Sequence, residues 1–308
     1  MVDIDEVSEN VYIIDAQLYS IPKCGCVYLL NEENKALIET GPATSADTVA
    51  RGIKKIGVSL QDISYVIVTH IHLDHAGGAG VLLKDMPRAQ VIVHHKGVRH
   101  LIDPTMLIKG TIEVMGREQL ERCGEAIPIE EHRVHGVGDG DTIRLSDRQT
   151  LKFIDAPGHA PHELCICESR NGGVFTGDAV GIYIPDGEIL LPFHPPPSFN
   201  LELCINTLKR LMELDAATIY FSHFGISSKV QQTLQLAMDK VQAWDDIIAK
   251  AVEENAIDNA IEKMRAQVCA ELEPIKEKLN SLYEHLISVH IPVWTAGHIK
   301  DYRERHNV

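Results

Sequence analysis

Short apolar runs separated by polar turns dominate the first part of the chain. Residues 11–15, 26–30 and 36–39 are each rich in apolar side chains and are bounded by polar or Asn-containing segments. Runs of this length and composition are typical of strands, and their close spacing predicts an antiparallel meander. A fourth run, residues 65–68, has the length of a buried strand and stops where the chain becomes polar at Thr69.

Further along, apolar runs alternate with segments of helical pattern. The pattern is helical over residues 48–56 and again, more weakly, over residues 98–126. Residues 181–200 are rich in proline and are expected to form a loop, because proline cannot continue a helix. The same criteria predict a helix over residues 201–214 and strands over residues 90–94, 151–154, 163–167, 174–176 and 218–221.

The chain changes character after residue 226. Apolar side chains recur at three- and four-residue steps from Val230 to Ala251 and from Ile257 to Leu272, which predicts two amphipathic helices. Pro274 should end or kink the second, and a third is expected over residues 275–288. We therefore divide the chain into residues 1–226 and a helical extension, residues 227–308. Its apolar stripes must be buried on the rest of the chain, in a homodimer or in a cap over a binding site.

Charge and composition narrow the classes of partner. The chain has 308 residues, of which 44% are hydrophobic, and a formal net charge of −15, which disfavours nucleic acid and other polyanions. The acidic N-terminus, MVDIDEVSEN, lacks the features of a secretory signal, and every apolar run is far shorter than a membrane span. We expect a cytoplasmic protein that acts on a small molecule without nucleic acid or membrane.

The seven cysteines fit the same picture. Their odd number and the absence of an export signal favour reduced thiols over a disulfide framework. Cys24 and Cys26 are separated by one residue, as are Cys165 and Cys167, whereas structural zinc sites favour two to four. We interpret these pairs as buried thiols, the second pair on one face of a strand.

The chemistry begins at the end of the strand at residues 65–68. The segment YVIVTHIHLDHAGG carries His70, His72, Asp74 and His75 within six residues. A loop leaving a strand can direct alternate side chains into one space, so His70 and His72 can share one metal ion. Asp74 and His75 can then reach a neighbouring ion, which is a two-metal layout.

Three later positions, each just after a predicted strand, can complete the two sets of ligands. His159 follows a Pro-Gly turn and can join His70 and His72, with His162 as the alternative in the same loop. Asp178 follows a strand and a glycine, where its two oxygens can bridge two ions. His223 follows the last predicted strand and would complete the second set.

THIHLDHAGG resembles the H-x-H-x-D-H signature of the metallo-β-lactamase superfamily, and APGH at 156–159, TGD at 176–178 and SHFG at 222–225 follow in the expected order. The resemblance covers about residues 7–225. It implies an α+β fold, a four-layer αββα sandwich with metals at one edge between two sheets, and favours His159 over His162. LIETG at 37–41 matches the family's usual LIDTG, except that Glu39 replaces Asp and leaves the role of that carboxylate in question.

The resemblance also places the proline-rich loop over the metals, which makes Tyr183 and His194 the candidates for substrate contacts.

We expect four other histidines to have structural roles or to lie on the surface. His94 and His95 are neighbours on a strand and should point to opposite faces, so they should not share an ion, and we expect them at a strand end that reaches solvent. His132 and His135 are expected on the surface, before a Gly-Asp-Gly-Asp sequence interpreted as a hairpin turn.

The predicted reaction follows from the ligands. Two divalent ions, Zn²⁺ in preference to iron or manganese, would hold a bridging hydroxide that attacks a carbonyl, with Asp74 orienting it. The resemblance makes thioesters, lactones and esters the candidate substrates, and both glyoxalase II-like and lactonase-like members stay open. The alternative is a di-iron oxygen or nitric-oxide reductase, in which a Glu commonly stands where this chain has His72. A metal-containing binding protein without turnover is a third possibility.

Overall fold

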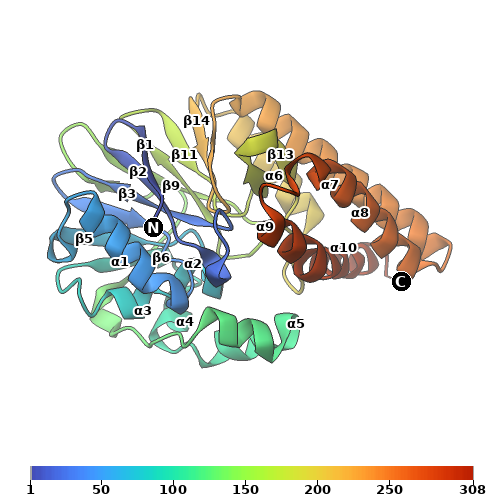
Figure 1. Cartoon of the computed structure of the whole chain (residues 1–308), viewed down its shortest axis with the longest axis horizontal. Coiled ribbons are helices and arrows are strands. Elements are labelled where there is room, and N and C mark those ends of the chain that lie inside the picture. The colour runs from blue at the N-terminus through green and yellow to red at the C-terminus, as the bar shows by residue number, and fades with distance from the viewer. Residues whose placement is uncertain (1, 308) are drawn as a thin grey trace.

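The computed structural model describes residues 2–307 and contains two large β-sheets (Figure 1). Strands of the first sheet follow the order of the chain, antiparallel up to β4 and parallel from there on. They are β1 (Ile4–Ser8), β2 (Val11–Asp15), β3 (Cys26–Leu30), β4 (Lys35–Ile38), β5 (Ile63–Ile67), β6 (Gln90–His94) and β7 (Val134–Val137). The predicted meander and the strand before the histidine segment are therefore confirmed.

The second sheet contains the strands predicted in the later half. Its order is β15-β14-β11-β10-β9-β8, and only the β11–β14 pair is parallel. The strands are β8 (Thr142–Arg144), β9 (Thr150–Asp155), β10 (Leu164–Glu168), β11 (Gly173–Phe175), β14 (Thr218–Tyr220) and β15 (Ile226–Ser227).

The two sheets pack face to face and are covered by helices on both outer faces. Side chains such as Tyr28 and Ile67 of the first sheet and Phe153 and Phe175 of the second form the apolar core between them. The first sheet is covered by α1 (Ala46–Lys55), α3 (Ala79–Leu82) and α4 (Val98–Ile102), and the second by α6 (Leu201–Met212) and the first half of α7 (Val230–Glu253). This is the expected four-layer αββα arrangement.

Alternation of apolar residues explains the inner core. In β10, Ile166 faces the other sheet, whereas Cys165 and Cys167 face the layer formed by α6 and α7, as predicted for this pair. None of the seven cysteines, which all lie within the described residues, forms a disulfide. The remaining elements are the long helix α5 (Thr105–Cys123) and the short α2 (Leu73–Ala76), η1 (Leu18–Ser20), η2 (Ala43–Ser45), η3 (Leu60–Asp62) and η4 (Glu131–Arg133).

The helical extension is confirmed, with its apolar stripes buried against the sandwich. Trp244 of α7 and Trp294 of α10 are at most 1% exposed and belong to the same apolar core as a small hairpin next to the second sheet. Figure 1 shows these helices side by side at one end of the molecule. They are α8 (Ile257–Leu272), η6 (Glu273–Ile275), α9 (Asn280–His285), the π-helix η7 (Leu286–His290) and α10 (Ile291–His306). The division after residue 226 stays a prediction.

Three local predictions were wrong. Residues 181–200 contain a hairpin, β12 (Ile182–Ile184) and β13 (Ile189–Leu191), joined by η5 (Pro185–Gly187), because its apolar residues are buried by the extension. The Gly-Asp-Gly-Asp sequence joins β7 of one sheet to β8 of the other and is not a hairpin turn. The third C-terminal helix, expected over residues 275–288, begins only at Asn280, and a π-turn separates it from α10.

Among residues 2–307, no helix has both the length and the apolar character that crossing a bilayer requires.

Candidate metal centre

Contacts between the two sheets bring the ligand-bearing loops together at one edge. The amide of Leu164 in the second sheet donates to the carbonyl of Thr69 at the end of β5, at 2.9 Å. The amide of Cys26 donates to the carbonyl of Ser222 at 2.8 Å. After Thr69 the chain turns into the one-turn helix α2, which starts after His72 and carries Asp74 on its first turn.

Glycines after α2 allow that helix to lie close to a neighbouring loop. A Cβ on Gly77 would lie 2.4 Å from the carbonyl oxygen of Leu73, and one on Gly78 would lie 2.9 Å from the carbonyl oxygen of Thr40. No side chain fits at these distances. Gly78 therefore allows the histidine segment to lie against the loop that follows β4, whereas the close contact of Gly77 is with α2 itself.

The first group of ligands contains His70, His72, His159 and Asp178, within 4.8 Å of one another. The Nδ1 atom of His72 lies 3.0 Å from the Nε2 atoms of both His70 and His159. The Oδ2 atom of Asp178 lies 3.3 Å from Nε2 of His159 and 3.7 Å from Nε2 of His70. Three ring nitrogens and a carboxylate thus point at one small space.

The second group contains Asp74, His75 and His223. Its Nε2 atoms also approach Asp178, at 3.3 Å for His75 and 3.4 Å for His223, the latter measured to the other carboxylate oxygen, Oδ1. Asp74 Oδ2 lies 3.7 Å from Nε2 of His223 and 3.9 Å from Nε2 of His75. Asp178 therefore lies between the two groups, as the sequence predicted.

Unpartnered polar atoms show that these residues fit metal ions. Both oxygens of Asp178 and the Nε2 atoms of His75 and His223 are buried without a hydrogen-bond partner. Burying polar atoms without partners is costly, and a cation would satisfy all four. Imidazole nitrogens with carboxylate oxygens form a donor set that suits zinc, iron or manganese.

A second contact orients four of the five histidine rings. The Nδ1 atoms of His159 and His223 lie 2.7 Å and 3.0 Å from the carbonyl oxygens of Phe193 and Cys24, so each can donate its hydrogen there. A ring that donates from Nδ1 has its lone pair on Nε2. His70 and His75 have corresponding Nδ1 contacts with side chains.

Glu39 and Thr69 provide those contacts. The Nδ1 atom of His75 lies 3.1 Å from a carboxylate oxygen of Glu39, and that of His70 lies 3.1 Å from the hydroxyl oxygen of Thr69. The Thr69 hydroxyl donates to the same oxygen of Glu39, which also accepts from the Ser222 hydroxyl at 2.9 Å. Glu39 therefore orients a ligand, which answers the question raised by the replacement of the usual Asp.

Burial sets the protonation of the first group. Desolvation lowers the pKa of His70 and His159 and lowers that of His72 to about 3, so all three rings are neutral at pH 7 with lone pairs available. Burial opposes ionisation of Asp178, but the neighbouring His75, His223 and His159 hold its pKa below its usual range. The pKa of His75 is raised, because Asp178, Glu39 and Asp74 outweigh the effect of burial. This excess negative charge is what a bound cation would neutralise.

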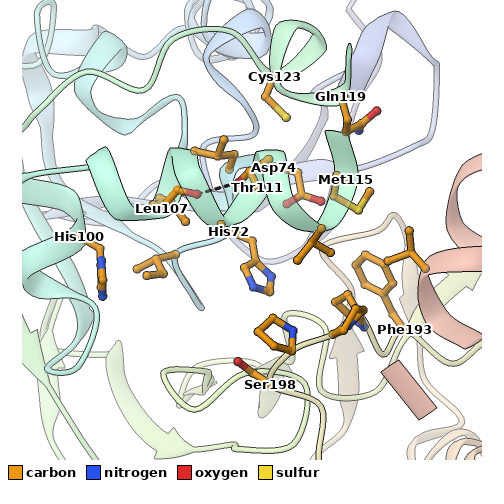
Figure 2. A pocket seen from close by; sticks show the side chains of 18 of the residues that line it. His72, Asp74, His100, Leu107, Thr111, Met115, Gln119, Cys123, Phe193 and Ser198 are labelled. Carbon is orange, nitrogen blue, oxygen red and sulfur yellow. Dashed lines mark hydrogen bonds between the residues drawn. The ribbon is translucent and has the colours of Figure 1, made fainter. Parts of the chain in front are cut away.

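A largely apolar cavity of about 370 Å³ opens onto the ligands (Figure 2). His72 and Asp74 face it from the ligand segment, and Leu107 and Met115 of α5 line it from the other side, as Figure 2 shows. Other walls come from the prolines at 195–197 and from the C-terminal helices. The region over residues 98–126, which the sequence predicted to be helical, thus borders the candidate site.

Neither predicted substrate contact lines this cavity. Tyr183 is in β12, where its ring stacks on Phe221 at 4.8 Å, and it borders a different, smaller cavity. His194 is buried, with its Nδ1 atom 2.9 Å from Nε2 of His298. Hairpin β12–β13 turns these side chains into apolar packing instead of toward the ligands.

Sequence reasoning gave other cavity residues no role in substrate binding. His162, weighed only as an alternative ligand, lies outside both ligand groups, and its ring is 5.8 Å from that of His72. His100 also lines the cavity. The sequence could have indicated His162 as a cavity residue, because it lies three residues after His159. The sequence around His100 does not distinguish it from an ordinary surface histidine.

The remaining histidines mostly follow the predictions. His132 and His135 are exposed. His95 is exposed and His94 is buried beside Asp155, at 3.4 Å, but their ring centroids lie 4.1 Å apart. The prediction that the two side chains point to opposite faces was therefore wrong, although neither belongs to a ligand group. The expectation that His94 reaches solvent was wrong, because its ring is buried against Asp155 at the end of β9.

A family model described as the metallo-beta-lactamase superfamily matches residues 24–223 of the chain. The chain belongs to this superfamily. The matched range contains all seven candidate ligands, and the superfamily supplies the general expectation of divalent metal binding.

Superfamily proteins of known sequence resemble the chain over most of its length. The metallo-beta-lactamase fold-containing protein ST1585 of Sulfurisphaera tokodaii is 24% identical over 261 residues, 80% of this chain and 94% of that protein. An N-acyl homoserine lactonase from a Bacillus species is 23% identical over 248 residues, 71% of this chain and 88% of the lactonase.

A solved structure also matches the extension. The metallo-beta-lactamase family protein TTHA1429 of Thermus thermophilus superposes with a TM-score of 0.66 at 20% identity, covering 98% of this chain and 95% of that one. At this identity the match describes the fold alone.

Proposed function

We propose that the chain is a binuclear metal-dependent hydrolase that cleaves a small ester, thioester or lactone. The observation that carries the proposal is the position of Asp178, whose two oxygens lie 3.3–3.7 Å from ring nitrogens of both ligand groups. A carboxylate in this position can bridge two cations, and binuclear sites are used to cleave polar bonds with water.

Metal ions bound there would lower the pKa of a water molecule toward 7 and polarise a carbonyl oxygen. Asp74 lines the cavity beside His75 and His223, so its carboxylate can accept a hydrogen bond from an attacking water and orient it. Glu39 and Thr69 hold the rings of His75 and His70 in place while charge develops. No serine or cysteine nucleophile is required.

The cavity walls indicate the substrate. Leu107, Val114, Met115, Phe193 and Val293 present apolar surface, which favours a substrate with an apolar acyl group. The lactonase relatives support a lactone or ester as the reacting group. The net charge of −15 disfavours a phosphodiester in a polyanion.

The experiment is a hydrolysis panel on protein whose metal content has been measured. Full-length protein loaded separately with zinc, iron or manganese is offered γ-lactones, acyl thioesters and 4-nitrophenyl esters. We expect metal-dependent turnover of at least one class, lost on chelation and in Asp178→Asn. Oxygen consumption by the iron-loaded protein, with no turnover on the panel, would instead assign a redox function. Full metal occupancy with neither activity would make it a binding protein.

A further inference from the structure

A second set of polar side chains lines the cavity beside the metal ligands. Gln119 of α5 and His290 of η7 are 5% and 2% exposed, and both line the cavity with Tyr19 of η1. The Nε2 atom of Gln119 and the Nδ1 atom of His290 are buried without a hydrogen-bond partner. None of the three belongs to either ligand group. We call Tyr19, Gln119 and His290 the polar subsite.

The polar subsite is continuous. Gln119 and Tyr19 line the same cavity, and the ring of Tyr19 lies 5.2 Å from that of His285. The Nε2 atoms of His285 and His290 are 3.1 Å apart, so one donates to the other. When His285 donates, the hydrogen of the His290 ring is on Nδ1, the unpartnered atom.

Phe193 connects the polar subsite to the metal centre. Its ring centroid lies 5.3 Å from that of His290 and 5.0 Å from that of His223. A molecule whose reacting carbonyl is at the second ligand group would therefore have a neighbouring part within reach of the subsite.

Backbone geometry at the polar subsite is unusual. Tyr19 has a φ of 56°, in the left-handed region that non-glycine residues rarely adopt, and Gln17 and Ser20 beside it also have positive φ. His290 ends a π-helix, a form that occurs frequently at functional sites. Strained backbone and unsatisfied buried donors both cost stability, and a bound ligand would offset the second cost.

We propose that the polar subsite binds an uncharged carbonyl oxygen, such as that of an amide, on the same molecule whose ester or lactone is hydrolysed. This inference rests on the proposed function and adds a recognition group to it. The donors are the amide hydrogens of Gln119, the hydroxyl of Tyr19 and the ring N–H of His290.

The donors are neutral, which selects a neutral acceptor. Burial and the nearby Asp74 raise the pKa of Tyr19, so its phenol stays protonated. Burial lowers the pKa of His290, which keeps its ring uncharged. A carboxylate bound here would have no charged partner among the three donors, whereas a neutral carbonyl oxygen needs none.

Three matched esters test the subsite on the metal-loaded full chain. They are 4-nitrophenyl hexanoate, the 4-nitrophenyl ester of N-acetyl-β-alanine, in which an amide replaces two methylenes, and the 4-nitrophenyl monoester of glutaric acid. We expect kcat/KM to be highest for the amide ester and lowest for the carboxylate ester. Preference for the carboxylate ester, or equal rates for all three, would overturn the inference.

Variants locate the effect. Gln119→Leu and His290→Phe should each lower kcat/KM for the amide ester on the order of tenfold, mainly through KM, while changing that for the hexanoate little. Thr111→Val is the control, because Thr111 lines the same cavity but its hydroxyl already donates to the carbonyl of Leu107 at 3.0 Å. It should retain the wild-type ratio between the two esters. Equal loss on both esters in the Gln119 and His290 variants would indicate a structural role only.

A binding measurement separates this inference from the proposed function. The ring of Trp294 stacks on His290 at 5.2 Å, so its fluorescence should respond when N-butylacetamide is titrated into the protein. If no ester is hydrolysed but the amide binds, and Gln119→Leu abolishes that binding, the subsite stands and the hydrolase assignment fails. If esters are hydrolysed but neither binding nor preference for the amide is seen, the subsite inference fails alone.

Discussion

The sandwich and the C-terminal extension both bury many polar groups, but they balance them differently. In the metal centre the Nδ1 atoms of His159 and His223 are partnered, which leaves Nε2 atoms and the carboxylate of Asp178 to converge without partners. In the extension, Asp245 and Asp301 both pair with Arg305. One region is complete only with an added cation, whereas the other neutralises its charges internally.

This difference predicts which property a substitution in each region should change first. Removing a ligand in the sandwich should change metal content and activity before it changes the fold. In the extension, changes to buried polar groups other than His290 of the polar subsite should appear first as altered stability. The predictions below test this contrast, beginning with the largest effect.

His72→Ala should lose one metal equivalent and reduce hydrolysis to background. His72 lies 3.0 Å from both other histidines of its group, so its removal opens that group. Elemental analysis of purified protein and the ester panel measure the two effects. His135→Ala is the control, because His135 is exposed and its Nε2 atom lies 2.8 Å from the side-chain oxygen of Gln90, outside both ligand groups. Loss of metal in the control would refute the assigned ligands.

Glu39→Gln should weaken metal binding by about 10- to 100-fold, since partners of metal-bound histidines contribute effects of this size. Competition with a chromogenic chelator measures the affinity. Glu168→Gln is a matched control, because Glu168 is equally buried in the sandwich and accepts from backbone amides far from the ligands, including that of Gly173 at 3.0 Å. It should lower stability and leave metal affinity unchanged. If Glu168→Gln weakened metal binding and Glu39→Gln did not, the role assigned to Glu39 in orienting His75 would be wrong.

Mild acid should destabilise the extension. Burial lowers the pKa of His285 to about 4 and of His298 to about 3, and lowers those of His194 and His290 well below the usual value. Below about pH 6.5 the unfolded chain therefore binds protons that the folded protein does not, and stability falls toward pH 4 by up to about 1.4 kcal/mol per pH unit for each ring.

Denaturant unfolding between pH 7 and 5, followed by tryptophan fluorescence, measures this slope. Both tryptophans, Trp244 and Trp294, lie in the extension. His298→Gln should flatten the pH dependence, whereas His132→Gln, an exposed position, should leave it unchanged. An unfolding midpoint that does not move with pH in the wild type would contradict the prediction.

Asp186→Asn should have the smallest effect, about 0.2–1 kcal/mol. Asp186 joins the hairpin to Lys278 of the extension and, at 3.3 Å, to Lys23. Because both lysines are partly exposed, and the extension is held by apolar burial around Trp244 and Trp294, the ion pairs should contribute little. Thermal unfolding at low and high salt measures the difference. A loss above about 2 kcal/mol would mean that charge, rather than apolar packing, fixes the extension.

Local chemistry made the ligands predictable from sequence. His70, His72, Asp74 and His75 lie together in one motif, and His159, Asp178 and His223 each follow a short apolar strand with a recognisable turn. The strands themselves were readable because several are buried on both faces and therefore consist of short, nearly continuous apolar runs.

Features that depend on distant packing could not be read in this way. Tyr183 and His194 were misplaced because the prolines around them concealed a hairpin whose partners lie in helices far along the chain. Gln119 and His290 belong to helices of unremarkable pattern, and they meet only after the extension docks on the sandwich. Their common role in the polar subsite comes from tertiary packing, and no local sequence pattern indicates it.

Each sheet is built from one continuous part of the chain, residues 4–137 for the first and 142–227 for the second. The first supplies His70, His72, Asp74 and His75, and the second supplies His159, Asp178 and His223. During synthesis, a nascent chain that has reached only β7 therefore holds four ligands and cannot close either group. If the two groups hold a pair of metal ions as proposed, both ions can be bound stably only after residue 223 has been synthesised, so metal loading would follow the joining of both sheets.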